Sequence, residues 1–302
     1  MPSAPATPLP TPAPRPMSDY QGLAISHAGH ATRLKWHRLR RRLDDPLFSA
    51  AVMKDGSRLG ASMELDLKVR ADGGFVVLHD DVLEGETTGQ GPVRDASAVD
   101  LRKLQMKVGG EALTLSEDLA DMLPTAHPHA LLQFDMKDDL ASIGERGLDH
   151  LTDHFRHLGQ HVIVSASDLD LILAIKKRMP GLRRGIDPTD QLVDLLHGEG
   201  LSAVEKALIA DITGPTEPET IYLAWPLLLD AASQGLDMIG ICHDHGKIVD
   251  AWTYNLRDPA QGFSEGEWQE FRSLMALRPD QITTDEPLAT EQAWADRTTA
   301  KG

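Results

Sequence analysis

The chain has 302 residues, of which 41% are hydrophobic and 25% are charged, so it is long enough to bury a full core as one large domain or two smaller ones. Its 30 Lys and Arg against 46 Asp and Glu give a formal net charge of −16, which argues against general binding to nucleic acid or anionic lipid. A single cysteine, Cys242, excludes an internal disulfide framework and a cysteine-based zinc site. Because no apolar run reaches the length of a membrane span, we expect a soluble protein and place it in the cytoplasm.

The chain begins with a proline-rich segment, residues 1–17, with the sequence MPSAPATPLPTPAPRPM. It holds seven of the 19 prolines and has no apolar stretch of the kind found in a secretory signal. Such a composition is typical of an extended polyproline-like tail. We therefore divide the chain into a disordered tail, 1–17, and one folded domain, 18–302.

From residue 18 onwards, short apolar runs alternate with longer stretches of helical periodicity, a pattern typical of parallel strands joined by helices. The eight runs are Leu23 to Ser26, Met63 to Leu67, Leu131 to Asp135, Val162 to Ser165, Arg184 to Ile186, Ile221 to Ala224, Ile248 to Tyr254 and Gln281 to Thr284. Eight parallel strands in a chain of this length predict an α/β fold, a (β/α)8 TIM barrel. An open doubly wound sheet is the alternative.

The segments between these strands predict three helices and one insertion. The helices are expected at Ser116 to Met122, Asp168 to Arg178 and Gly266 to Leu277. The run Phe75 to Leu78 follows the turn signal Ala71-Asp72-Gly73-Gly74, which predicts a small insertion after strand two, beside the barrel mouth. The basic run from Arg33 to Arg42 is typical of an amphipathic helix with a solvated face.

Carboxylates gather at the ends of the second and third predicted strands. Side chains at the C-terminal ends of barrel strands converge on one pocket, and residues two apart on a strand, such as Glu64 and Asp66, point to the same face. A divalent cation would remove the repulsion between them, and Asp135 would complete an oxygen-rich shell suited to Mg or Ca. The alternative is a pair of polar barrel residues bonded to backbone or to Lys137.

Two histidines follow predicted strands directly, His27 after the first and His79 after the inserted run. Taken singly, each is more typical of a structural histidine than of a catalyst. Together with the carboxylates, they predict two imidazoles that face one phosphate from opposite sides, as general base and general acid.

Six segments of the sequence resemble the glycerophosphodiester phosphodiesterase family: ISHAGH, MELDLKVRADGGFVVLHDDVLEGETTGQGPV, LQFDMK, VIVSASD, GKIVDAWTYN and DQITTDEP. The resemblance implies a TIM barrel that hydrolyses a small-molecule phosphodiester with one divalent cation, Mg or Ca, and that serves lipid metabolism. It also implies roles for individual residues: metal ligation by Glu64, Asp66 and Asp135, acid/base catalysis by His27 and His79, a phosphate contact by Lys137 and a place in the alcohol pocket for Trp252.

One departure from the family pattern concerns the arginine that follows the first histidine, because residue 28 is an alanine here. Loss of a bidentate arginine would cost about 1.5 to 3 kcal/mol of phosphate binding. His30, Arg33 or Lys35 could supply the missing positive charge.

The sequence leaves open the substrate and two rival functions. The substrate is a glycerophosphodiester or a sugar phosphodiester, whose ring could stack on Tyr222, Trp225 or Trp252. The products expected are a phosphomonoester and an alcohol. The rivals are a phosphodiester-binding protein with little or no turnover, and a lyase that forms a cyclic phosphate. The oligomeric state is also open.

Overall fold

A computed structural model describes residues 20–299 of the chain, so the predicted tail lies outside the described residues. The strands are β1 (Ala24–His27), β2 (His30–Trp36), β3 (Ser62–Val69), β4 (Phe75–Val77), β5 (Leu131–Met136), β6 (Val162–Ala166), β7 (Arg183–Ile186), β8 (Thr220–Ala224), β9 (Ile248–Trp252) and β10 (Gln281–Thr284). The α-helices are α1 (Ala50–Leu59), α2 (Leu83–Glu86), α3 (Ala98–Leu101), α4 (Ser116–Met122), α5 (Leu140–Phe155), α6 (Leu169–Arg178), α7 (Thr189–Gly198), α8 (Leu201–Ile212), α9 (Trp225–Ser233), α10 (Met238–Asp244), α11 (Glu265–Ala276) and α12 (Pro287–Thr299). Short 3-10 turns are η2 (His37–Leu39), η3 (Val93–Asp95) and η4 (Leu123–Thr125).

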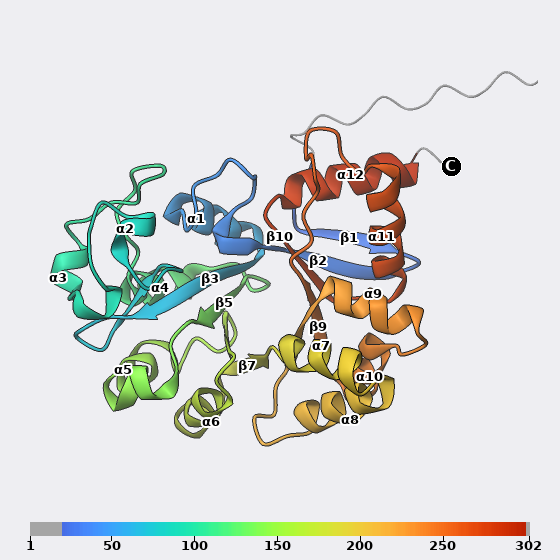
Figure 1. The fold of residues 1–302 in the computed structure, drawn as a ribbon. Coiled ribbons are helices and arrows are strands. Elements are labelled where there is room, and N and C mark those ends of the chain that lie inside the picture. Colours follow the sequence, from blue (N-terminus) through green and yellow to red (C-terminus); the bar gives the residue numbers. More distant parts are fainter. Residues whose placement is uncertain (1–19, 300–302) are drawn as a thin grey trace, which may run out of the picture.

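The strands form one sheet in the order β1-β2-β10-β9-β8-β7-β6-β5-β3-β4, and a further pairing of β2 with β3 closes it. Within residues 20–299, the closed part consists of eight parallel strands, with β1 and β4 attached outside it as antiparallel neighbours of β2 and β3. This confirms the predicted (β/α)8 barrel and excludes the open doubly wound sheet. The antiparallel strand β4 and the helices α2 to α4 that follow it form the predicted insertion beyond the end of β3 (Figure 1).

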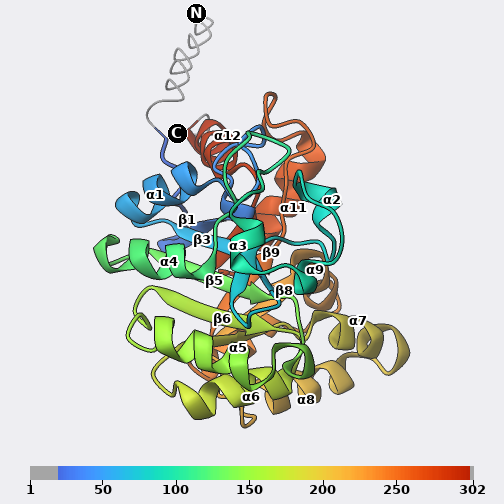
Figure 2. The ribbon, with the colours of Figure 1, turned by 90° about the vertical axis from the view of Figure 1, so that its left-hand side faces the viewer.

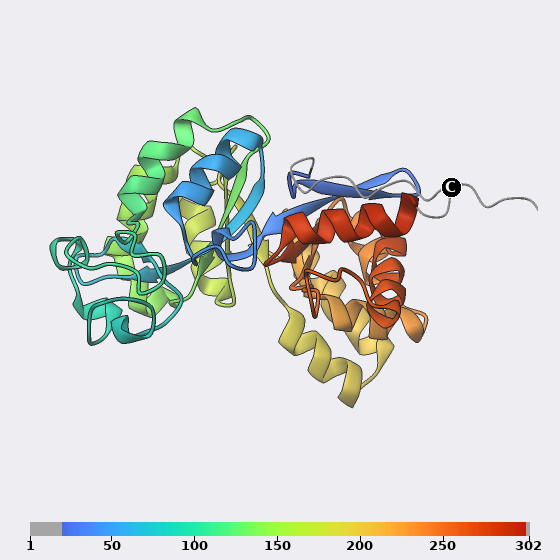
Figure 3. The ribbon, with the colours of Figure 1, turned by 90° about the horizontal axis from the view of Figure 1, so that it is seen from above.

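The two halves of the chain lie on opposite sides of the barrel (Figures 1 and 3). Elements from α1 to α6 surround one apolar cluster, and elements from α7 to α12 surround a second one. In Figure 2, β3, β5 and β6 of the first half face the viewer. β2 joins the halves: Leu34 packs into the second cluster, whereas Trp36 packs into the first, and neither is exposed.

The prediction for the first barrel strand was wrong. The run Leu23 to Ser26 lies largely in β1, which pairs antiparallel with β2, with Ala24 opposite Arg33 and His27 opposite His30. The barrel strand is β2, which runs parallel to β10 and β3. The helix expected from Arg33 to Arg42 is absent from this described stretch, because side chains of β2 alternate: Leu34 and Trp36 pack into the apolar clusters while Lys35 lines the cavity described below.

The other predicted elements agree with the structure. The helix Ser116–Met122 is α4, and the two remaining predicted helices correspond to α6 and α11 within one residue at their ends. Cys242 is fully buried in α10, and burial raises the pKa of its thiol to about 12. None of the helices within residues 20–299 is long and apolar enough to cross a membrane. The cytoplasmic location stays a prediction.

A glycine in α1, Gly56, allows this helix to pack closely against Trp36 of β2 and Met63 of β3. A Cβ on Gly56 would overlap the Sδ atom of Met63 and lie 3.0 Å from the Trp36 ring. We expect Gly56→Ala to lower the free energy of unfolding by about 1 to 3 kcal/mol, the usual cost of overpacking, as measured by urea denaturation. Gly266→Ala in α11 is the matched control, since a Cβ there meets no atom within 4 Å. Equal stability of the two variants would contradict this packing.

Candidate active site

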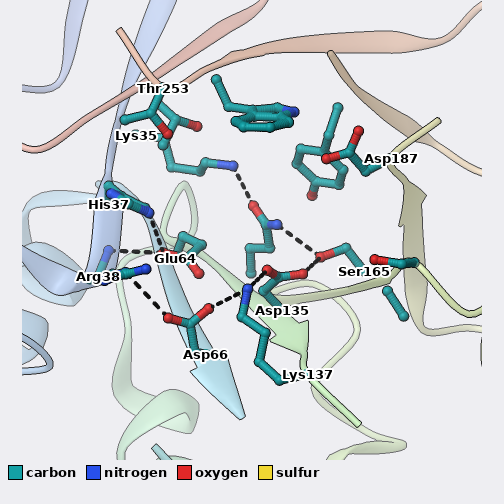
Figure 4. Close-up of a pocket in the computed structure, with 16 residues that line it drawn as sticks. Lys35, His37, Arg38, Glu64, Asp66, Asp135, Lys137, Ser165, Asp187 and Thr253 are labelled. Atoms are coloured by element: carbon teal, nitrogen blue, oxygen red, sulfur yellow. Dashed lines mark hydrogen bonds and ion pairs between the residues drawn. The ribbon is translucent and has the colours of Figure 1, made fainter. Parts of the chain in front are cut away.

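A cavity of about 350 Å³ opens at the C-terminal mouth of the barrel (Figure 4). All eight barrel strands contribute charged or polar side chains to its wall, either from the strand itself or from the residues directly after it. The lining residues are Lys35, His37, Arg38, Glu64, Asp66, Gln133, Asp135, Lys137, Ser165, Ala166, Ser167, Asp187, Tyr222, Trp252, Thr253 and Thr283.

Three carboxylates meet on one side of this cavity. Glu64 and Asp66 are two apart on β3, and the parallel register of β3 and β5 places Asp135 beside Asp66. Each contributes an oxygen, and these oxygens lie within 4.8 Å of one another. Burial and repulsion from Asp66 and Asp135 raise the pKa of Glu64 well above its ordinary value. A buried oxygen of Asp66, Oδ2, accepts no hydrogen bond from the described residues. The cluster thus has the negative charge and an oxygen without a hydrogen bond, both of which suit a hard divalent cation.

Two cationic side chains flank the carboxylates. The Nζ atom of Lys137 lies 2.9 Å from Asp66 Oδ1 and 2.5 Å from Asp135 Oδ2. The Nε atom of Arg38 lies 3.4 Å from Asp66 Oδ2, and the backbone N–H of Arg38 donates a 2.8 Å hydrogen bond to Glu64. Arg38 adopts a left-handed backbone, with φ of 50°, directly after β2. Positively and negatively charged side chains thus alternate around one small volume. The carboxylates suit a metal cation, and the cationic side chains suit an anionic group bound to that cation.

His37 faces the same carboxylates from the end of β2. Its Nδ1 atom lies 2.8 Å from Asp285 Oδ1, and its Nε2 atom lies 3.9 Å from Glu64 Oε2. Burial alone would raise the pKa of Asp285, but the hydrogen bond and charge of His37 and the nearby Arg40 lower it to about 2. Asn255 donates a 2.6 Å hydrogen bond to the other oxygen of Asp285. A carboxylate fixed in this way accepts the proton on Nδ1, which leaves Nε2 directed at the cavity.

The structure does not bring His27 and His30 to this cavity. Both lie at the turn of the β1–β2 hairpin, where the His27 ring packs edge-on against Trp294 and His30 Nε2 lies 3.0 Å from the Pro279 carbonyl oxygen. Ala28 belongs to the same turn, with φ of 47°, so it does not follow the first barrel strand.

The histidine and arginine that do follow the first barrel strand are His37 and Arg38, which the sequence reasoning missed. The resemblance predicts a His-Arg pair at this place, and the dipeptide His37-Arg38 after the alternating run of β2 was the available signal.

The remaining predicted residues divide between the cavity and its surroundings. Trp252 and Tyr222 line the cavity, whereas Trp225 packs against Tyr254 with ring centroids 5.0 Å apart. His79 follows β4 and is not among the lining residues; its side chain is 39% exposed, and its Nδ1 atom lies 3.1 Å from Asp80. Glu64, Asp66, Asp135 and Lys137 are brought together as expected.

Parallel barrels of this kind carry their active sites at the C-terminal mouth, and the charges gathered there suit hydrolysis or transfer of an anionic group. Residues 49–289 match the model of the glycerophosphoryl diester phosphodiesterase family. The chain belongs to this family, which confirms the predicted resemblance and the assignment as a phosphoric diester hydrolase. The match begins beyond His37 and Arg38, so their place in the site is established by the fold alone.

Individual relatives agree with this family. A glycerophosphodiester phosphodiesterase from Caldanaerobacter subterraneus subsp. tengcongensis is 24% identical over 185 residues, which cover 58% of this chain and 70% of the relative. A putative glycerophosphoryl diester phosphodiesterase from Silicibacter pomeroyi shares the fold with a TM-score of 0.66 at 17% identity, over 88% of this chain and 94% of that one. An Oleispira antarctica phosphodiesterase, solved with the product sn-glycerol-3-phosphate, has a TM-score of 0.63 at 16% identity, over 86% of this chain and 95% of that one.

Proposed function

We propose that this protein hydrolyses a glycerophosphodiester, or a related sugar phosphodiester, to a phosphomonoester and an alcohol with the help of one divalent cation, Mg or Ca. The observation that carries the proposal is the carboxylate triad of Glu64, Asp66 and Asp135, whose oxygens lie within 4.8 Å of one another. Membership of the family supports the reaction, and the sn-glycerol-3-phosphate bound to the Oleispira antarctica relative supports a glycerol phosphate product.

The triad would hold the cation, which when bound offsets negative charge on the phosphate. Arg38 and Lys137, which lie beside the triad and pair with its carboxylates, would bind the non-bridging oxygens of the same phosphate. Trp252 and Tyr222 offer apolar ring surface for the alcohol portion or for a sugar ring.

His37 is our candidate for general base. Its Nε2 atom faces the cavity and takes the proton of the nucleophile, which is either water or a neighbouring hydroxyl of the substrate. Asp285 holds the ring and stabilises the imidazolium that forms. His79, on the loop after β4, remains our candidate for the acid that protonates the leaving alkoxide.

The two rival functions differ in what they would require. A binding protein without turnover was suggested by Ala28, and that suggestion loses its basis because Arg38 stands at the site. A lyase would use a substrate hydroxyl as the nucleophile and release a cyclic phosphate. Phosphorus NMR of the products separates hydrolysis from this reaction, because a cyclic phosphate has its own resonance.

Metal dependence gives the direct test of the proposed function. We expect turnover of glycerophosphocholine by the purified protein to stop when EDTA removes divalent cations and to return when Mg, Ca or Mn is added in excess. The reason is that three carboxylates left without a cation repel the negatively charged phosphate that must enter the site. Choline release is the measurement. Turnover that is unchanged in EDTA, after the protein has been stripped of metal by dialysis, would contradict the proposal.

A further inference from the structure

The three carboxylates of the triad are held in different ways. The side chains of Glu64 and Asp66 are 6% and 2% exposed, so close packing restricts them. The side chain of Asp135 is 29% exposed, so packing restricts it less, and each of its two oxygens contacts a hydrogen-bond donor. Lys137 contacts Oδ2 at 2.5 Å, and the Ser165 hydroxyl contacts Oδ1 at 3.0 Å. The position of the third ligand therefore depends on both partners, and Ser165 holds the oxygen that Lys137 does not contact.

Ser165 is the last member of a chain of hydrogen bonds that crosses the barrel interior from β2 through β5 to β6. The ammonium of Lys35 donates to Gln133 Oε1, and Gln133 Nε2 donates to Ser165 Oγ at 2.8 Å. Ser165 Oγ then donates to Asp135 Oδ1. Figure 4 shows this relay running from Lys35 to Ser165 and Asp135.

The hydrogen bonds of this relay have a fixed donor-to-acceptor direction because Lys35, where it begins, has no acceptor atom in its side chain. An ammonium only donates, so Gln133 must turn its carbonyl oxygen to Lys35 and its NH₂ group to Ser165. Ser165 thus accepts from Gln133 and has its own proton free for another acceptor. Asp135 Oδ1 at 3.0 Å is closer than the Phe134 carbonyl oxygen at 3.5 Å, and it carries charge.

The ammonium that sets this direction is itself held in place. Its Nζ atom lies 2.7 Å from Asp250 Oδ2 and 4.5 Å from the centre of the Tyr222 ring. Lys35 is 3% exposed and Asp250 is not exposed at all, and Thr283 donates a 2.7 Å hydrogen bond to Asp250. A charged pair so deeply buried is costly to place in a barrel, and the phosphodiesterase mechanism above makes no use of it.

We propose that Lys35, Gln133 and Ser165 are positioning residues that orient Asp135 as a ligand of the divalent cation, and so set the affinity of the site for that cation. The inference rests on the proposed function, since it assumes that the triad binds a cation. The donor from Ser165 fixes one oxygen of Asp135, so the other is presented towards Asp66 and Lys137. Because none of the three residues touches the reacting phosphate in this scheme, their loss is expected to weaken cation binding more than kcat at saturating cation.

Titration of the metal-free protein with Mn²⁺ by calorimetry tests the relay. For Ser165→Ala we expect the Kd to rise about 10- to 100-fold, the usual effect of removing a partner behind a metal ligand, and kcat for glycerophosphocholine to recover at saturating Mn²⁺. Gln133→Glu keeps the size of the side chain but offers acceptors to both neighbours, so Ser165 turns its proton to residue 133 and Asp135 loses its donor. We expect a weaker Kd here too, although an added negative charge alone would tighten cation binding.

Gln133→Leu completes the series without leaving Asp250 unpaired, which a change at Lys35 would do. It removes the hydrogen bonds of residue 133 to Lys35 and Ser165 but leaves the Ser165 proton free for Asp135. The Kd for Mn²⁺ should therefore rise less than in Gln133→Glu. Thr220→Val is the matched control, because this buried strand hydroxyl has no hydrogen-bond partner within residues 20–299, and its Kd should equal that of the wild type. An unchanged Kd in Ser165→Ala, or a tighter one in Gln133→Glu, would overturn the relay while the proposed function stands. A wild-type protein that binds no Mn²⁺ would overturn both.

Discussion

His37→Ala is expected to lower kcat for glycerophosphocholine by about 10² to 10⁴-fold, the range that general acid/base catalysis supplies. The imidazole is 23% exposed, is bonded through Nδ1 to Asp285 and presents Nε2 to the triad. Removing it takes away the proton acceptor but leaves Glu64, Asp66 and Asp135 in place. KM and the Kd for Mn²⁺ should therefore change little, and steady-state choline release under saturating Mn²⁺ is the measurement.

His27→Ala is the natural comparison, since the sequence alone pointed to this residue as the catalyst. His27 lies in the β1–β2 hairpin and packs edge-on against Trp294, so its loss removes one ring contact on the outside of the barrel. We expect kcat to stay near the wild-type value. If His27→Ala lost activity and His37→Ala kept it, the assignment of His37 as general base would fail.

The sequence predicted His27 as a catalytic residue, whereas His37 lies at the cavity, and the difference comes from the way the strands pair. Both histidines stand at the end of short runs with alternating apolar residues, and both runs are strands, β1 ending at His27 and β2 ending just before His37. Which of the two enters the barrel is decided by β10, whose residues Gln281 to Thr284 pair with Arg33 to Trp36. A pairing between segments almost 250 residues apart leaves no trace in the apolar pattern of either strand, so the dipeptide His37-Arg38 was the one local difference that pointed to β2.

The carboxylate triad could be predicted because its geometry is local. The spacing of Glu64 and Asp66 fixes a shared face through the period of two in a strand, and Asp135 lies on the next parallel strand along the chain. The partner of His37 could not be found in the same way. Asp285 follows β10, and its contact with His37 exists only because β10 and β2 end side by side where the barrel closes.

Glu64→Gln is expected to abolish measurable turnover and to remove the rise in Tm that Mn²⁺ gives the wild-type protein. Glutamine has nearly the same shape as glutamate and can still accept the hydrogen bond from the Arg38 backbone, but it supplies no negative charge to a cation. Thermal unfolding with and without Mn²⁺ measures the loss of binding apart from activity, because a ligand that binds only the folded state raises Tm.

The same substitution should raise Tm when no metal is present. Glu64 is 5% exposed, and burial together with repulsion from Asp66 and Asp135 raises its pKa, which means that the ionised carboxylate is unfavourable in the folded protein without a cation. Replacing it by a neutral amide removes that repulsion. Without metal, the variant would thus be more stable than the wild type, and adding metal would not stabilise the variant further. This is the behaviour expected of a residue that serves binding at the expense of stability.

Glu286→Gln separates this effect from the general consequence of neutralising a buried glutamate. Glu286 is 2% exposed and accepts a hydrogen bond from the Leu256 backbone, and burial raises its pKa to about 7, but it does not line the cavity. Its variant should keep the full Mn²⁺-dependent rise in Tm. If Glu64→Gln kept that rise as well, the cation would have to bind elsewhere, and the triad would be a group of polar barrel residues paired with Lys137 and Arg38.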